Sequence, residues 1–338
     1  MSFQTKLAVN VVYTTFSRTE SLIKSVENVL AELPCSKIYI YSDSWPIGND
    51  TTEYLINNHR NNITNHFKGN PNIMIIKRPK NLGMLNAIHS IKAHLGLKPV
   101  LFLEDDIIPL NGFGQFLEMV CSKFSNDPWV TTASLFNPLS LFNSFHRPLR
   151  ITRISMYGTL LWPNKIDLIR RISQAEVSLV KNNNNLMARM LATLSPEGFN
   201  FSLIDYYSKN FNALDCRLTF RQALYGTHGI VPQVSLIENL GLSGDGTNCP
   251  DSPRLRKIFH KNINNSGIAY DLALQPYEYN LSKDIDAAHV TLLDPKTGSC
   301  PDYSGCSLWS DYVESHLQSR FHFKRQRLYG KIRSVFPN

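Results

Sequence analysis

The strongest constraint on the fold is a regular alternation, over about 135 residues, between short apolar runs and longer segments with helical spacing. The short runs are rich in β-branched residues, which is typical of strands. The longer segments repeat apolar residues every three or four positions, which is typical of helices packed on a core. Strands that alternate with helices predict an α/β fold with a parallel sheet and right-handed crossovers. The predicted strands are residues 6–13, 37–41, 72–76, 100–103 and 129–134.

The helical segments carry their own start and packing signals. Ser17 and Glu20 have the spacing of a capping box, so the first helix is expected to begin there. Leu22, Val26 and Val29 then form an apolar stripe that would face the core. The predicted helices of this half are residues 17–33, 51–58, 84–95 and 113–124.

The apolar run at residues 100–103 leads directly into three carboxylates, Glu104, Asp105 and Asp106. An ionised carboxylate that is buried without a partner is very costly, so these acids need water, basic partners or a hard divalent cation. The carboxyl ends of strands in open α/β sheets are also where ligands bind. The pattern therefore indicates a ligand site, with an acidic surface loop as the alternative.

The composition is that of a globular protein. The chain has 338 residues, of which 43% are hydrophobic and 18% charged, enough for one large or two small domains. No apolar run approaches the roughly 18 residues that span a bilayer, and the N-terminus lacks a secretory pattern, so a cytoplasmic protein is expected. The six cysteines form no Cys-x-x-Cys pair, and Cys300 and Cys306 are poorly spaced for zinc, so free thiols are expected.

The sequence contains neither Gly-x-Gly-x-x-Gly nor a Walker phosphate loop. Dehydrogenases and P-loop enzymes use such glycine-rich backbone to bind phosphates, so both classes are disfavoured. A diphosphate at the sheet edge would need another source of positive charge. The acidic triplet points to a bridging Mg²⁺ or Mn²⁺.

The second half of the chain is less regular. Residues 150–163 mix aromatic side chains with glycine, which is typical either of a sugar-stacking surface or of a strand beside an aromatic core. Residues 239–249 form a glycine-rich loop with one acid, Asp245. Helices are expected at residues 165–182, 186–194, 201–211 and 215–225, and a strand interrupted by Pro232 at residues 230–236.

Four motifs follow one another between residues 6 and 250. They are Ser17-Arg18 with Ser42-Asp43; Arg78 to Met84, including Asn81-Leu82-Gly83; Glu104-Asp105-Asp106 with Pro109; and Asp215 followed by Asn239-Leu240-Gly241 and Asp245-Gly246-Thr247. In this order and spacing the chain resembles bacterial glycosyltransferases of the GT-A fold, in the branch similar to N-acetylglucosaminyltransferase I. The resemblance implies a mixed, mostly parallel central sheet flanked by helices.

The resemblance also implies a role for each motif residue. Thr14, Thr15 and Asp43 would hold the nucleotide base and ribose. Asp106 would bind the metal ion, Mn²⁺ or Mg²⁺. Glu104 and Asp105 would contact the ribose and the donor sugar. The other donor-site residues that it implies are Arg18, Arg78, Asn81, Gly83, Asn239 and Asp245.

An inverting transfer needs a carboxylate that deprotonates the acceptor hydroxyl, separate from the metal-binding carboxylate. Asp215 lies where the resembling enzymes carry this base. Ala213 and Leu214 precede it here, whereas those enzymes commonly have Ser-Trp, which bears on the acceptor pocket. Asp205 is a rival base, and a helix N-cap is the structural alternative for Asp215.

The C-terminal tail concentrates positive charge. The formal net charge of the chain is +8, and six basic residues but no acidic ones follow Glu314. They interleave with aromatic residues, which is typical of a helical segment attracted to an anionic membrane surface. A solvated tail is the alternative. Nucleic-acid binding is not expected, because the core offers no aromatic platform motif.

Together with the resemblance, these features predict an inverting, metal-dependent glycosyltransferase of hexosyltransferase type. It would move a sugar from a nucleotide-diphosphate donor, expected to be a UDP-sugar, to a saccharide or lipid-linked saccharide in bacterial surface polysaccharide, lipopolysaccharide or capsule synthesis. Residues 1–140 would bind the donor, 141–295 would carry the acceptor site and base, and 296–338 would form a helical basic tail at the inner membrane face. The alternatives are a catalytically idle nucleotide- or sugar-binding protein and a sugar-phosphate nucleotidyltransferase, which would lack its usual phosphate loop.

Overall fold

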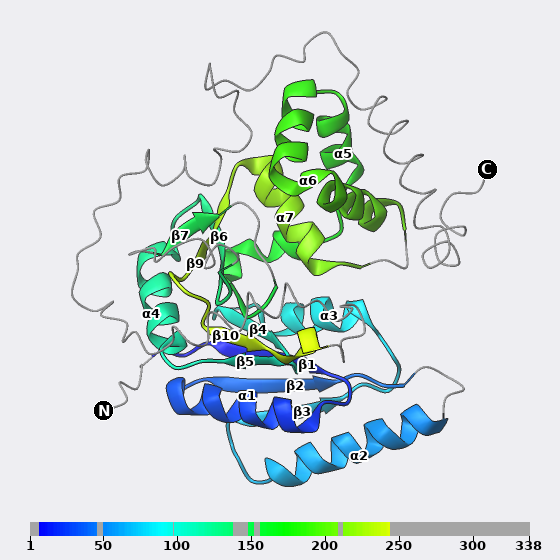
Figure 1. The fold of residues 1–338 in the computed structure, drawn as a ribbon, viewed down its shortest axis with the longest axis vertical. Coiled ribbons are helices and arrows are strands. Elements are labelled where there is room, and N and C mark those ends of the chain that lie inside the picture. The colour runs from blue at the N-terminus through cyan, green and yellow to red at the C-terminus, as the bar shows by residue number, and fades with distance from the viewer. Residues whose placement is uncertain are drawn as a thin grey trace. The chain divides into compact units, whose positions relative to one another are not determined.

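The computed structural model describes residues 7–45, 50–96, 98–137, 148–151, 156–208 and 212–243. They belong to two compact units (Figure 1). Of the described residues, the first unit contains those up to Asp167 and residues 228–243, and the second contains those from Leu168 to Thr227. Residues 244–249 of the predicted glycine-rich loop, which include Asp245, and the predicted basic tail at residues 296–338 lie outside the described residues.

A central sheet organises the first unit. Its strands are β1 Asn10–Thr15, β2 Lys37–Ser42, β3 Ile73–Lys77, β4 Val100–Glu104, β6 Val130–Ser134, β7 Leu149–Ile151, β8 Thr159–Leu161 and β9 His228–Val231. They form an eight-stranded sheet in the order β3-β2-β1-β4-β8-β6-β9-β7. The first four strands in this order are parallel and β6 is parallel to β9, whereas β8 and β7 run antiparallel to their neighbours.

The helices of this unit that the structure describes are α1 Thr19–Glu32, α2 Asp50–His66, α3 Met84–His94 and α4 Phe113–Phe124. α3 packs on β1 and α4 on β6. The predicted α/β fold class, a mixed and mostly parallel central sheet flanked by helices, is therefore confirmed. The capping-box prediction is wrong, because Arg18 rather than Ser17 is the N-cap of α1 and makes no side-chain cap bond.

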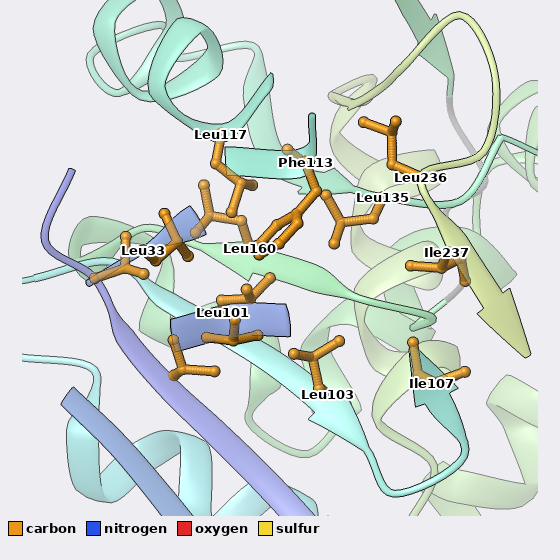
Figure 2. Packing of buried hydrophobic residues seen from close by; sticks show 14 of the residues in the cluster. Leu33, Leu101, Leu103, Ile107, Phe113, Leu117, Leu135, Leu160, Leu236 and Ile237 are labelled. Carbon is orange, nitrogen blue, oxygen red and sulfur yellow. The ribbon is translucent and has the colours of Figure 1, made fainter. Parts of the chain in front are cut away.

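The core of the first unit lies where these helices meet the sheet. On one face of β4, Leu101 and Leu103 are 0% exposed, and on the other face Val100 and Phe102 are 0% and 2% exposed, as expected for a strand that is covered on both faces. Figure 2 shows Leu101 and Leu160 beside Phe113 and Leu117 of α4. Removing such a side chain from water contributes about 1.5–3 kcal/mol, so the buried centre of the sheet holds the strand ends in place.

The acidic stretch is two strands joined by a tight turn, not one strand. β4 ends at Glu104, Asp105 and Asp106 form the turn, and β5 Ile107–Pro109 follows. β5 pairs antiparallel with β10 Ile237–Asn239, with Ile107 opposite Asn239. This small second sheet brings residues near position 240 beside the acidic turn, as Figure 2 shows for Ile107 and Ile237.

Two described parts of the aromatic stretch at residues 150–163 belong to the sheet, the end of β7 and all of β8. β8 lies between β4 and β6, and all three of its residues are buried. Trp162 directly after it is 1% exposed and packs in the core. Of the two interpretations, a strand beside an aromatic core is therefore the one that the structure supports, since a buried indole has no face for a sugar.

The second unit is helical. A 3₁₀ segment, Pro163–Ile169, leads into α5 Gln174–Lys181, α6 Asn184–Tyr207 and α7 Leu214–Tyr225. α6 continues through Pro196, where two separate helices were expected. The apolar cluster of the second unit includes Met187 and Phe199 of α6 and Phe220 of α7. In the described ranges, no helix is long and apolar enough to cross a membrane.

A buried ion pair joins α5 to α7 in this unit. The Arg221 Nε donates to Glu176 Oε1 at 2.7 Å, and the same guanidinium donates to the carbonyl oxygens of Leu168 and Arg170. Glu176 also closes a capping box with Ser173 at the start of α5. Burial alone would raise the pKa of Glu176, but the hydrogen bonds from Arg221 and Ser173 outweigh it and lower this pKa to about 2.

Glu176 should make the helical unit acid-sensitive. A carboxyl with a folded pKa of about 2 contributes stability above its unfolded pKa, near 4.5, which is lost as the pH falls through 2. Between pH 5 and pH 2.5, wild type should lose about 2 kcal/mol more unfolding free energy than Glu176→Gln, measured by urea denaturation. Replacement of the exposed Glu118 by Gln is the control and should leave the wild-type slope. Equal acid losses in wild type and Glu176→Gln would contradict the assignment.

Candidate functional site

The parallel register brings the predicted donor-site residues to one edge of the sheet. Thr15 lies opposite Ser42, and Thr14 lies opposite Glu104. Asp43 directly follows β2, and Arg78 directly follows β3. The ends of β1, β2, β3 and β4 therefore meet at the edge where open α/β sheets bind ligands.

Asp105 is held by the end of β1 and by the turn after it. Its Oδ2 accepts hydrogen bonds from Thr15 Oγ1 at 2.8 Å and from the Phe16 backbone N–H at 3.0 Å. Its Oδ1 accepts from Arg18 Nη1 at 3.2 Å. The residue is 6% exposed, so its charge is neutralised by these donors rather than by water. Asp105 thus serves to fix the strand ends, whatever it contacts on a ligand.

His59 on α2 extends this network and was not predicted. Its Nε2 lies 2.9 Å from Thr15 Oγ1, and its Nδ1 lies 2.8 Å from Thr19 Oγ1. Since the Thr15 hydroxyl donates to Asp105, it must accept from His59, so the Nε2 carries the proton. Burial lowers the pKa of His59 to about 4, which keeps the ring neutral near pH 7.

A helical signal could have identified His59. The predicted helix stopped at residue 58, but buried positions continue along α2 at helical spacing. They are Ile56, His59, Arg60 and Ile63. A polar pair on a core-facing stripe indicates side chains with buried partners. The extended stripe would have placed both residues against the sheet.

Asp106 has fewer hydrogen bonds to its carboxylate than Asp105 among the described residues. Its Oδ2 accepts from Arg18 Nη1 at 2.9 Å, and its backbone oxygen accepts from the Leu240 N–H at 2.9 Å. Its Oδ1 is buried and, among the residues described, has no hydrogen-bond partner. Burial raises the pKa of Asp106, and Arg18 partly offsets this. A buried carboxylate oxygen without a donor is a position suited to a cation.

The turn after β10 closes over Asp106. Asn239 Oδ1 accepts from the Gly241 N–H at 2.9 Å, which shapes the turn. A Cβ added at Gly241 would lie 2.1 Å from Asp106 Oδ2 and 3.2 Å from Asn239 Oδ1. Only glycine fits there without moving the carboxylate, so Asn239 and Gly241 act on the site through Asp106.

Asp43 is bound to the loop that precedes α3. Its carboxylate accepts from the backbone N–H groups of Leu82 and Gly83, at 2.9 and 2.8 Å, and also from Ser44. Asn81 Nδ2 donates to the Ser44 carbonyl. Gly83 has a φ of +51°, which favours glycine. The motif therefore holds the loop against the end of β2, and any ligand contact of Asp43 would come in addition.

Arg78 and Arg60 serve the architecture of this edge. Arg78 donates to Asn86 Oδ1 and Ser90 Oγ on α3, both at 3.0 Å, and its guanidinium lies 4.4 Å from the centre of the Tyr41 ring. Arg60 donates to the carbonyl oxygens at the ends of β2 and β3. Among the described residues, the salt bridges of Asp105 and Asp106 are made by Arg18.

The described residues contain no group of three or more His, Cys, Asp or Glu side chains arranged to hold a metal ion. Asp106 nevertheless fits a hard divalent cation, because Mg²⁺ and similar ions are commonly held by one or two carboxylates together with substrate phosphates. The buried Oδ1 of Asp106 supplies one such oxygen. Glu104, exposed at the end of β4, is a neighbouring carboxylate.

The two candidate bases lie in the helical unit. Asp205 is fully buried, and its carboxylate accepts from Arg217 Nε and from the Ala213 N–H. Asp215 is exposed in the first turn of α7. Ala213 is the N-cap of α7, so Asp215 does not have the N-cap role that was its structural alternative.

Comparisons with known proteins give only distant likenesses. No known family model matches the chain, and no curated protein sequence does. One of the similar solved structures is a mannosyltransferase from Pyrobaculum calidifontis in complex with GDP-Man and Mn²⁺, at 10% identity and a TM-score of 0.36, with 97% of this chain and 84% of that chain covered. Another is an active-site mutant of LgtC, at 13% identity and a TM-score of 0.34, with 66% of this chain and 72% of that chain covered.

Gly241→Ala should damage the site because the new methyl group collides with Asp106. We expect a loss of about 1–3 kcal/mol in unfolding free energy and weaker Mn²⁺ binding, measured by urea denaturation and by electron paramagnetic resonance of free Mn²⁺. Gly96→Ala is the matched control, since an added Cβ there meets no atom within 4 Å. Unchanged Mn²⁺ binding by Gly241→Ala would show that Asp106 is not part of a metal site.

Proposed function

We propose that the chain is a metal-dependent glycosyltransferase that uses a nucleotide-diphosphate sugar as donor. The observation that carries the proposal is the Asp105-Asp106 turn at the carboxyl edge of a mostly parallel sheet, with a buried Asp106 oxygen that lacks a hydrogen-bond partner in the described part of the chain. Such an edge is where nucleotides bind, and such an oxygen suits a divalent cation.

The first unit would provide the donor site. Thr14 and Asp43 lie at the ends of β1 and β2, where the base and ribose would bind. Asp105, fixed by Thr15 and Phe16, and the exposed Glu104 would face the ribose and donor sugar. Asp106 would hold the divalent cation, which when bound supplies Lewis-acid stabilisation of charge on the departing diphosphate.

We further propose that transfer inverts the sugar and that Asp215 is the general base. A base must reach the acceptor hydroxyl, and Asp215 is exposed on α7. Asp205 is the weaker candidate, because it is fully buried and paired with Arg217. Its carboxylate instead holds the start of α7 through the Ala213 N–H.

The finer parts of the proposal come from the resemblance of the motifs. They are a UDP-sugar as donor, a hexosyl group as the transferred sugar and a saccharide or lipid-linked saccharide of a bacterial surface polysaccharide as acceptor. Peripheral attachment to the inner face of the membrane depends on residues 296–338, outside the described residues. Measuring which nucleotide sugars raise the Tm in the presence of Mn²⁺ would test the identity of the donor separately from metal binding at Asp106.

Nucleotide-sugar binding should depend on Mn²⁺ and on Asp106. With UDP- and GDP-sugars at roughly 100-fold above Kd, a bound donor should stabilise the protein by about 2.7 kcal/mol, seen as a rise in Tm. The rise should vanish with EDTA and in Asp106→Asn, which keeps the side-chain shape but removes the charge. Glu118→Gln, an exposed change on α4, should respond like wild type. A full Mn²⁺-dependent rise in Asp106→Asn would contradict the metal assignment.

Asp215→Asn should separate binding from chemistry. We expect release of the nucleotide diphosphate from the donor to slow by about 10²- to 10⁴-fold, because general-base catalysis is removed, while the donor-induced rise in Tm stays unchanged. Asp205→Asn should instead lower Tm without ligand, because it breaks a buried ion pair. Full activity in Asp215→Asn, with activity lost in a folded Asp205→Asn, would reverse the assignment.

A further inference from the structure

Arg18 occupies the acidic turn that the proposed metal ion would share. Its Nη1 lies 2.9 Å from Asp106 Oδ2 and 3.2 Å from Asp105 Oδ1, so one nitrogen bridges both carboxylates. Burial alone would lower the pKa of Arg18, but the charges of Asp106 and Asp105 outweigh this and raise it. By these two contacts, Arg18 is the counter-ion of both carboxylates in this structure.

A divalent cation on Asp106 would meet this guanidinium. Asp106 Oδ1, which has no hydrogen-bond partner among the described residues, and Asp106 Oδ2, which accepts from Arg18, belong to the same carboxylate. Two positive groups on one carboxylate repel each other, and they repel more strongly where burial limits screening by water. Binding of the metal alone must therefore work against Arg18 or displace it.

The structure allows Arg18 to leave without collapse of the turn. Asp105 keeps its hydrogen bonds from Thr15 Oγ1 and the Phe16 N–H when the guanidinium moves away. The Arg18 side chain is 29% exposed and extends from the N-cap of α1, so it has solvent on one side. Asp106 would then be left to the cation.

A nucleotide diphosphate supplies the alternative partner for Arg18. Guanidinium groups bind phosphate oxygens with paired, charge-assisted hydrogen bonds. A diphosphate that bridges to a cation on Asp106 would bring such oxygens to the same turn. The guanidinium could then exchange one anionic partner for another instead of losing its partner.

We propose that Arg18 couples metal binding to diphosphate binding: it neutralises Asp106 in the free protein and moves to the diphosphate when metal and nucleotide bind together. The inference rests on the proposed function and adds that Mn²⁺ alone binds weakly. Because such coupling is reciprocal, Mn²⁺ and the nucleotide each raise the affinity for the other by the same factor.

The test is Mn²⁺ titration followed by electron paramagnetic resonance, with and without UDP, which needs no turnover. Arg18→Gln should bind Mn²⁺ alone at least tenfold more tightly than wild type, a gain of about 1.4 kcal/mol. The factor by which UDP raises Mn²⁺ affinity should fall at least tenfold in this variant. Arg18→Lys restores the positive charge and should return Mn²⁺ affinity toward the wild-type value.

Lys24→Gln is the matched control, because it also removes one positive charge from α1. Lys24 is 61% exposed and lies 3.7 Å from Glu238, so its loss should leave Mn²⁺ affinity unchanged. The inference is overturned if a folded Arg18→Gln, checked by its Tm, binds Mn²⁺ alone no more tightly than wild type. If wild type binds UDP but never Mn²⁺, the metal dependence in the proposed function fails as well, and the two failures are thereby distinguished.

Discussion

Two consecutive carboxylates at the end of a buried strand impose the constraint on which the candidate site depends. β4 carries Asp105 and Asp106 to the edge of the sheet, where neither can remain charged without partners. The surrounding chain meets this need from several directions: β1 provides Thr15, the first turn provides the Phe16 N–H and Arg18, and α2 provides His59 behind Thr15. Asp105 is thereby satisfied, whereas Asp106 keeps a buried oxygen that has no hydrogen-bond partner within the described ranges. This difference in hydrogen bonding is why we regard Asp105 as a structural acid and Asp106 as a candidate cation ligand.

Much of the site is made of residues that position others. Asp43 holds the Asn81-Leu82-Gly83 loop through backbone N–H groups, and Arg78 is held between Tyr41 and α3. Asn239 and Gly241 shape a turn that lies against Asp106. Because these hydrogen bonds already order the side chains and loops, little further conformational entropy is lost when the site binds a ligand. Motif residues that suggest ligand contacts therefore also explain why the strand ends keep their geometry.

In the helical unit, the buried charged side chains that the structure describes stabilise the packing of helices. Its buried charges, Glu176 with Arg221 and Asp205 with Arg217, are paired within the unit. They tie helices to one another and to the carbonyl oxygens of the 3₁₀ segment, and replacing one partner would leave the other buried and uncompensated. Asp215, by contrast, is exposed. Asp205 is buried and paired with Arg217, so we assign it a structural role. Asp215 is exposed and can be reached by an acceptor, so it is the proposed base.

The sequence by itself determined the alternation of strands and helices, the buried strand before Glu104 and the strand-end position of Asp43, because periodicity records which face of each element meets the core. It could not show that β8 enters the sheet antiparallel between β4 and β6, or that Asp43 binds a loop about 40 residues away. Nor could it show that Gly241 lies against Asp106 or that Arg18 bridges both acids. Those contacts join segments far apart in the chain, and only the packing of the whole sheet decides which of them meet.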